Sequence, residues 1–368
     1  MTEKQQLLLT PGPLTTSAAT RQAMQRDWGS RDPAFIELTR RIRTRITDIA
    51  GGADTHSCVL LQGSGTYGLE AATATFVPSG GHVMVLANGA YCHRIATICE
   101  ILGRNVEIYE TGEDTPPDPA AVAKRLAADE TIGHVVLVHC ETTSGILNPL
   151  AEVARVVAAA GRSLMVDAMS SFGAIPIDVN ETPVDVVISS SNKCLEGVPG
   201  LAFAIASNDV LAASAGNAPS MVLDLYAQAA GFDKSGEWRF TPPTHVVAAL
   251  DSALDQLEEE GGVAARNARY RENCAILVDG MGALGFQTYL SHNLQAPIIV
   301  TFHTPQDAAF DFQAFYAGLQ DRGFTIYPGK LTKADSFRIG CIGQVFPEDM
   351  RAAVAAVGEI IADMGVSV

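Results

Sequence analysis

The sequence lacks the features that mark several broad classes of protein. Its 368 residues carry 25 Lys and Arg against 41 Asp and Glu, so the formal charge is −16 at pH 7. General nucleic-acid binders need an excess of cations to displace counterions from phosphate, so that class is excluded. The longest apolar runs, such as residues 134–139, are far shorter than the ~20 residues of a membrane helix. We therefore expect neither nucleic acid nor a membrane as a partner.

Cysteine usage and the N-terminus narrow the classes further. The seven cysteines are scattered and none forms a CxxC pair, which argues against a disulfide framework and a structural zinc site. We expect most of them to be buried thiols. The histidines lack HExxH spacing, so no metal is expected. The first residues show no basic stretch followed by an apolar run and a cleavage site, which predicts a cytoplasmic protein.

Short β-branched runs alternate with amphipathic stretches from residue 56 onward. The expected strands are rich in Val, Ile and Leu and lie at 56–61, 82–87, 105–109, 135–139, 163–166, 184–189 and 201–206. The expected helices between them lie at 65–76, 91–102, 119–128 and 150–160. Continuously apolar strands are typical of a sheet that crossover helices cover on both faces. The pattern predicts an α/β fold with a mostly parallel sheet.

A second, smaller unit is expected near the C-terminus. A long helical pattern at 244–261 ends at a Gly-Gly pair that suits a helix C-cap. The residues after it mix three expected helices with three expected strands, as in an α+β domain. The opening segment around Thr10-Pro-Gly-Pro13 contains too much proline for regular structure. We therefore expect an N-terminal arm at 1–15, a large domain at 16–260 and a small C-terminal domain at 261–368.

A glycine-rich loop follows the first expected strand. Gly63-Ser-Gly-Thr-Tyr-Gly68 matches GxGxxG between a strand and a helix, where backbone N–H groups can bind a phosphate. A dinucleotide site would also need an acidic residue ~20 positions on, at the end of the next strand. That strand ends at Asn88 instead. We favour a lone phosphate site, with an NAD-dependent dehydrogenase and a merely structural turn as alternatives.

Lys193 and Asp167 suggest carbonyl chemistry. Lys193, one of only six lysines, follows an expected buried strand and lies in a small glycine-rich turn. Desolvation lowers the pKa of such an amine and lets it form a Schiff base, whereas a surface lysine would have no such role. Asp167 ends the neighbouring expected strand, at the edge where open α/β sheets bind ligands. A lysine, an acid and a phosphate loop are together what pyridoxal phosphate requires.

Several further motifs lead to a family. They include Thr10-Pro-Gly-Pro-Leu-Thr-Thr16, Asp27-Trp-Gly-Ser-Arg-Asp-Pro33, Gln62-Gly-Ser-Gly-Thr66, Ala87-Asn-Gly-Ala-Tyr91, Glu141-Thr-Thr-Ser-Gly145, Val166-Asp-Ala-Met-Ser-Ser171 and Ser189-Ser-Ser-Asn-Lys-Cys-Leu-Glu-Gly-Val-Pro-Gly200. Through these motifs the sequence resembles the fold-type I, class V aminotransferases from Leu8 to the region of Arg338. The resemblance implies the fold-type I transferase fold, pyridoxal 5'-phosphate as cofactor, and a homodimer with its sites at the interface.

The resemblance also implies a role for each candidate residue. Lys193 would form the Schiff base, and Asp167 would pair with the pyridine nitrogen. The other implied roles are phosphate binding by Gly65, Thr66, Ser190 and the second subunit's Thr241, stacking on the ring by Tyr91, a hydrogen bond near the ring oxygen by Thr143, and substrate-anion binding by Arg338. The alternatives left open are helix packing for Tyr91, a turn for Thr143 and a surface ion pair for Arg338. Arg31 and Lys330 remain other candidates for the anion.

The implied reaction moves the amino group of 2-aminoethylphosphonate to pyruvate by a ping-pong mechanism in phosphonate degradation. Alanine:glyoxylate and serine:pyruvate aminotransferases of the same class remain alternatives, because their chemistry on the side of pyruvate is nearly the same. A dehydrogenase and a non-catalytic cofactor-binding protein are the alternatives from other classes.

Overall fold

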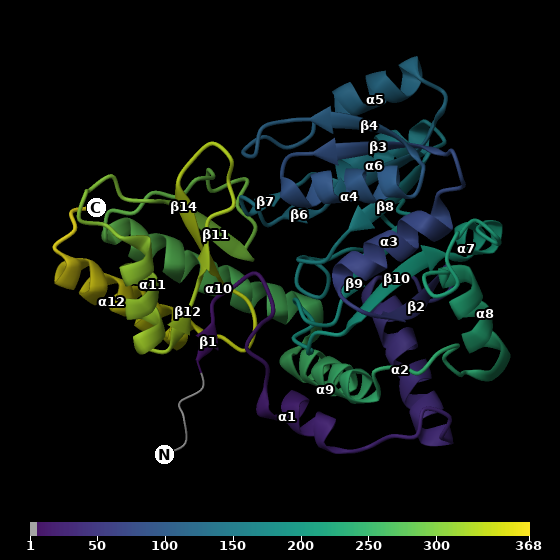
Figure 1. The fold of residues 1–368 in the computed structure, drawn as a ribbon, viewed down its shortest axis with the longest axis horizontal. Coiled ribbons are helices and arrows are strands. Elements are labelled where there is room, and N and C mark those ends of the chain that lie inside the picture. Colours follow the sequence, from purple (N-terminus) through teal and green to yellow (C-terminus); the bar gives the residue numbers. More distant parts are fainter. Residues whose placement is uncertain (1–5) are drawn as a thin grey trace.

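A seven-stranded sheet forms the centre of the larger part of the molecule (Figure 1). The computed structural model describes residues 6–368, and the first five residues of the expected N-terminal arm lie outside this range. In sheet order the strands are β2 (His56–Gln62), β10 (Leu201–Ser207), β9 (Val186–Ser190), β8 (Ser163–Asp167), β5 (Ile132–Val138), β3 (His82–Ala87) and β4 (Asn105–Glu110). Only β10 runs antiparallel to its neighbours. The expected mostly parallel sheet is confirmed.

Helices pack against this sheet because its inner strands are apolar along nearly their whole length. All five residues of β9 and four of the five in β8 are buried. The helices of this part are α1 (Ala18–Gln22), α2 (Pro33–Ile49), α3 (Gly65–Phe76), α4 (Ala90–Ile101), α5 (Pro119–Ala128), α6 (Leu150–Ala159), α7 (Asn208–Ala213), α8 (Leu225–Ser235) and α9 (Thr244–Glu260), with a short 3₁₀ turn at Ala23–Gln25. A single hydrophobic core joins residues from Phe35 to Leu257.

A smaller three-stranded sheet lies in the C-terminal part. Its order is β11 (Ile299–His303), β14 (Ser336–Gly340) and β13 (Tyr327–Pro328), and its helices are α10 (Gly262–Ala283), α11 (Phe312–Asp321) and α12 (Pro347–Met364). Aromatic rings fill its core: the ring of Phe337 lies 5.3 Å from that of Phe315 and 5.7 Å from that of Phe302. The expected boundary at 260/261 falls at the junction of α9 and α10.

The N-terminal arm belongs to the smaller part. Strand β1 (Leu7–Leu8) pairs in parallel with β12 (Phe324–Thr325), and Leu9 is buried in the C-terminal core. A further two-stranded ladder, β6 (Cys140–Glu141) with β7 (Ile146–Leu147), follows β5. The arm therefore approaches the carboxyl ends of the large sheet from the smaller part.

Two other observations bear on the sequence-based expectations. All seven cysteines are free and buried, as expected. Within residues 6–368, no helix has the length and apolar character required to cross a membrane.

Candidate active site

A pocket of about 640 Å³ opens where the carboxyl ends of the large-sheet strands meet. The loops after β2, β8 and β9 reach the same edge, because parallel strands present their ends together. Six of the nine residues expected at the site line this pocket: Gly65, Thr66, Tyr91, Asp167, Ser190 and Lys193. The structure thus joins segments that lie more than 100 residues apart in the chain.

Lys193 lies on the loop after β9, beneath the N-terminal arm. Its Nζ donates a hydrogen bond to the carbonyl of Pro11 at 2.6 Å. Gly12 has a φ of +120°, and a Cβ there would lie 2.6 Å from Lys193 Cδ, so only glycine fits. The side chain is partly buried, and desolvation by the surrounding protein lowers the pKa of Lys193. A lowered pKa makes the amine a better nucleophile near neutral pH.

Asp167 is the last residue of β8, the strand next to β9. Its Oδ1 accepts the N–H of Met169 at 2.9 Å, and the residue is only 4 % exposed. Burial raises the pKa of Asp167 to about 6, against a smaller opposing effect of the Met169 hydrogen bond. A positive group in the pocket would stabilise this carboxylate. The protonated nitrogen of a pyridine ring fits that requirement.

The glycine-rich loop and the first turn of α3 form a site suited to phosphate. Ser64 precedes the helix and makes no capping hydrogen bond with its side chain, so it leaves the N-terminal N–H groups of α3 to another acceptor. A Cβ at Gly65 would lie 2.5 Å from the Met169 sulfur, so glycine allows this close approach. Thr66 Oγ1 accepts a hydrogen bond from Arg94 at 3.3 Å. A cation, a hydroxyl and free N–H groups therefore converge on one place.

Tyr91 faces the pocket from the first turn of α4, and Glu141 holds it there. The fully buried Glu141 carboxylate accepts the Tyr91 N–H at 3.1 Å through Oε2 and the Thr143 N–H at 2.9 Å through Oε1. Acidic groups at a helix N-terminus are stabilised by the helix dipole. Sequence reasoning gave Glu141 no role, although it lies within the motif Glu141-Thr-Thr-Ser-Gly145.

Three of the nine expected site residues, Thr143, Thr241 and Arg338, do not line the pocket. Thr143 is fully buried, and its hydroxyl donates to Glu141 at 2.6 Å and accepts the Ala90 N–H at 3.0 Å. Its neighbour Thr142 lines the pocket instead. Thr241 lies on the surface in a separate hollow beside Arg31 and has an exposed side chain. Its expected contact with a second subunit stays a prediction.

Arg338 lies against the pocket wall from β14. Its Nη1 donates to the carbonyl of Thr142 at 2.8 Å, and its Nε donates to that of Pro328 at 3.1 Å. The residue is 5 % exposed, and no carboxylate of residues 6–368 lies within 4.0 Å of its nitrogens. The surface ion pair considered for Arg338 is therefore wrong. The guanidinium is held in place without being neutralised.

A second buried carboxylate, Glu196, supports the loop that carries Lys193. Its backbone has a φ of 60°, rare for a residue other than glycine, and its N–H donates to the Lys193 carbonyl at 2.7 Å. The side chain accepts hydrogen bonds from Tyr270 at 2.6 Å, Arg269 at 2.8 Å and Gln344 at 2.6 Å. Tyr270 and Arg269 belong to α10, and Gln344 precedes α12. All three lie in the smaller part, so Glu196 connects that part to the loop that carries Lys193.

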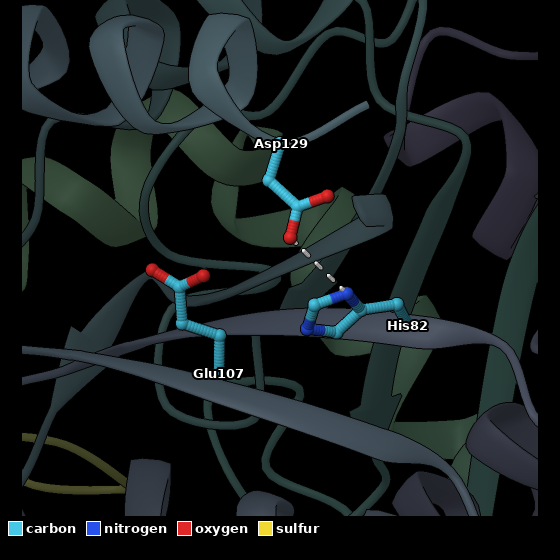
Figure 2. A group of neighbouring side chains, drawn as sticks. All are labelled: His82, Glu107 and Asp129. Carbon is cyan, nitrogen blue, oxygen red and sulfur yellow. Dashed lines mark ion pairs between the residues drawn. The ribbon is translucent and has the colours of Figure 1, made fainter. Parts of the chain in front are cut away.

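His82, Glu107 and Asp129 form a cluster at the opposite edge of the sheet (Figure 2). His82 Nδ1 lies 3.7 Å from Asp129 Oδ2. Both carboxylates already have protein partners: Arg125 contacts Glu107, and the N–H of Thr131 donates to Asp129 at 2.8 Å. Ion pairs and a turn therefore account for the cluster, which is remote from the pocket.

Comparison with known proteins agrees with the geometry of the pocket. The Aminotransferase class-V family model matches residues 16–330, and the chain belongs to this family. It is 56 % identical over 360 residues to a 2-aminoethylphosphonate--pyruvate transaminase of Pseudomonas fluorescens, covering 98 % of each chain. It is 54 % identical over 364 residues to the transaminase of that name from Pseudomonas aeruginosa, covering 99 % of this chain and 98 % of the relative.

Solved structures confirm the expected fold-type I architecture. Ureidoglycine-glyoxylate aminotransferase from Bacillus subtilis superimposes with a TM-score of 0.91 at 22 % identity, covering all of this chain and 96 % of that one. Pyridoxamine-pyruvate aminotransferase from Mesorhizobium loti gives 0.89 at 26 % identity, covering 100 % and 94 %. In addition, β2 is an edge strand beside antiparallel β10, whereas the first strand of a dinucleotide fold lies inside a parallel sheet. The dehydrogenase alternative is therefore wrong.

Proposed function

We propose that this chain transfers the amino group of 2-aminoethylphosphonate to pyruvate, with pyridoxal 5'-phosphate as cofactor. The products are phosphonoacetaldehyde and L-alanine. The observation that carries the proposal is the convergence of Lys193, Asp167 and the N-terminus of α3 on one pocket. The high identity to transaminases named for these substrates supports the choice of donor and acceptor.

Different residues of the pocket would hold different parts of the cofactor. When bound, pyridoxal phosphate supplies an aldehyde for the amine and a ring that withdraws electrons from the reacting carbon. The first turn of α3, Thr66 and Ser190 would hold the phosphate. Asp167 would keep a proton on the ring nitrogen, because its buried carboxylate is stabilised by a positive partner. Tyr91 would cover a face of the ring.

Lys193 moves the proton. Since burial lowers the pKa of its amine, a larger fraction of Lys193 is neutral and able to accept a proton at neutral pH. Its Nζ would take the proton from the carbon that bears the donor nitrogen. In the second half-reaction the same atom returns a proton to the carbon that becomes the α-carbon of alanine. The Pro11 carbonyl orients the amine through the hydrogen bond at 2.6 Å.

Arg338 would hold the substrate anion in both half-reactions. The carbonyls of Thr142 and Pro328 occupy two of its donors and fix the plane of the guanidinium. Forked N–H donors match the oxygens of a phosphonate as well as those of a carboxylate. A single arginine can therefore serve 2-aminoethylphosphonate first and pyruvate afterwards.

The enzyme would act as a homodimer. Thr241 is exposed and lies outside the pocket of its own chain, as required of a residue that completes the phosphate site of a partner. A size measurement in solution by light scattering tests this part of the proposal. A monomer that transaminates at full rate would contradict it.

A substrate panel tests the proposed reaction. The loaded enzyme is given pyruvate with 2-aminoethylphosphonate or L-serine, and separately glyoxylate with L-alanine. We expect the amino group to be transferred fastest from 2-aminoethylphosphonate to pyruvate. Faster turnover of serine would instead indicate a serine:pyruvate aminotransferase, and faster transfer from alanine to glyoxylate an alanine:glyoxylate aminotransferase.

A further inference from the structure

Four basic side chains surround Tyr91, although the chain carries a formal charge of −16. Lys330 Nζ lies 4.0 Å from the centroid of the Tyr91 ring, and the Arg94 guanidinium carbon lies 4.9 Å from it. Lys193 and Arg338 are close enough for their charges to act on the Tyr91 hydroxyl. Four of the 25 lysines and arginines therefore lie around one aromatic ring.

Within the described part of the chain, none of the four groups forms a direct ion pair with a carboxylate, although the charges of Asp167 and Glu141 act on Lys193 and Arg338 from a longer distance. Over residues 6–368, no carboxylate oxygen lies within 4.0 Å of a charged nitrogen of Lys193, Arg94, Lys330 or Arg338. Elsewhere many arginines have such partners; Arg269 Nη2, for example, lies 2.8 Å from Glu196. A group of uncompensated cations in a cleft attracts anionic ligands.

Three of these cations already have a task in the proposed reaction. Lys193 is the reacting amine, Arg94 donates to Thr66 at the phosphate loop, and Arg338 holds the substrate anion. Lys330 has none. Burial raises the pKa of Tyr91, and the charge of Lys330 is the strongest of the effects that lower it.

The position of Lys330 links it to Arg338. Lys330 lies two residues after Pro328, whose carbonyl accepts a hydrogen bond from Arg338 Nε at 3.1 Å. Two residues further on, the Thr332 N–H donates to Glu113 at 3.2 Å, which ties this loop of the smaller part to the large part. The segment 329–335 is thus fixed at both sides while the lysine lies over the aromatic wall of the pocket.

We propose that Lys330 is a second anion-binding residue, which makes the site prefer a dianionic phosphonate over a carboxylate. This inference rests on the proposed function. A phosphonate can carry a second negative charge that Arg338 alone does not compensate. A lysine ammonium on a flexible stem can leave the Tyr91 ring and approach that charge, because a partly exposed cation–π contact is weaker than a charge-assisted hydrogen bond. Pyruvate and alanine bear one charge and need Arg338 alone.

The variant Lys330→Met tests the role, with Lys333→Met as its control. Methionine keeps an unbranched apolar stem and removes the charge, and Lys333 is an exposed lysine of the same loop. On the holoenzyme we expect Lys330→Met to lower kcat/KM for 2-aminoethylphosphonate about 10- to 100-fold, while the reverse half-reaction with L-alanine changes less than about 3-fold. Lys330→Arg should retain most of the preference, and Lys333→Met should resemble wild type.

Binding of unreactive analogues provides a second readout. Ethylphosphonate and propionate lack the amino group, so calorimetry on the holoenzyme measures anion binding without turnover. Lys330→Met should weaken ethylphosphonate binding and leave propionate unchanged. Equal losses for both anions, an equal loss in Lys333→Met, or no loss would overturn the inference. A wild-type enzyme that binds ethylphosphonate through Lys330 but makes no alanine from 2-aminoethylphosphonate would contradict the proposed function instead.

Discussion

Glu196 Oε1 lies 2.8 Å from Arg269 Nη2, and this fully buried carboxylate joins the loop of Lys193 to helix α10. Arg269 Nε also lies 2.8 Å from Glu260 Oε1, and Arg269 Nη1 donates a hydrogen bond to the Gly343 carbonyl at 2.6 Å. Because each buried charge depends on the others, removal of one leaves its partners uncompensated. The alignment of the lysine loop therefore depends on contacts made by the smaller part of the molecule.

Glu196→Ala should lower the free energy of unfolding by about 3 to 5 kcal/mol, the range for breaking a buried ion pair. Chemical denaturation of the holoenzyme measures this loss. Glu258→Gln removes an exposed carboxylate that pairs with Arg45 and should cost less than about 1 kcal/mol. Equal, small effects of both substitutions would show that the network contributes little.

Lys193→Ala should still bind pyridoxal phosphate through the phosphate loop, but without a covalent bond. After borohydride reduction of the wild-type enzyme, peptide mass spectrometry should locate the cofactor adduct on Lys193. Lys330 serves as the internal comparison, because it also lies near the pocket. An adduct found on Lys330 alone would overturn the assignment.

Asp167→Asn should reduce the first half-reaction at least ~100-fold, the scale seen when one electrostatic contact to a reacting group is removed. The amide cannot supply the negative charge that keeps the ring nitrogen protonated. Stopped-flow absorbance of the loaded enzyme with 2-aminoethylphosphonate measures this rate. Near-normal turnover would mean that the carboxylate is only structural.

Asp167 should also affect the stability of the cofactor-free chain in a pH-dependent way. Burial raises its pKa to about 6 in the fold, from about 3.9 in the unfolded chain. Its contribution to stability is therefore full below about pH 4 and is lost as the pH rises through 6. The loss is about 3 kcal/mol. Urea titrations measure the free energy of unfolding of Asp167→Asn and of wild type at pH 4 and at pH 8. The variant should gain stability relative to wild type between pH 4 and pH 8. A difference that stays constant over this range would contradict this.

Arg338→Lys keeps the charge but loses the forked geometry. We expect kcat/KM to fall about 10- to 100-fold for both 2-aminoethylphosphonate and pyruvate. The absorbance of the loaded enzyme should not change, because Arg338 does not hold the cofactor. A defect confined to the phosphonate would show that pyruvate is bound by another residue.

The large sheet could be predicted from sequence because its signals are local. Strand β3 and helices α3 and α5 have the expected bounds, since apolar runs are bounded there by Gly, Pro or Asp. Helix α2 was not predicted although its signals are present, with Asp32 before Pro33 and buried Phe35 and Ile42 in a helical pattern. That helix could have been found.

The supporting carboxylates could not be predicted in the same way. Glu141 acts on Tyr91, 50 positions away, and Glu196 on Arg269 and Gln344, 73 and 148 positions away. Such contacts arise only when the chain has folded. Likewise, the choice of Thr142 over Thr143 at the pocket wall depends on which hydroxyl Glu141 engages, and no pattern in Glu141-Thr-Thr-Ser-Gly145 specifies it.

The most direct test of the account separates the two halves of the transfer in time. The loaded enzyme is mixed with 2-aminoethylphosphonate that is isotope-labelled at nitrogen, passed through a desalting column, and then given pyruvate. We expect labelled L-alanine in an amount close to the amount of enzyme, and none from Lys193→Ala. A wild-type enzyme that yields no labelled alanine would contradict the claim that the amino group is held in the pocket between donor and acceptor.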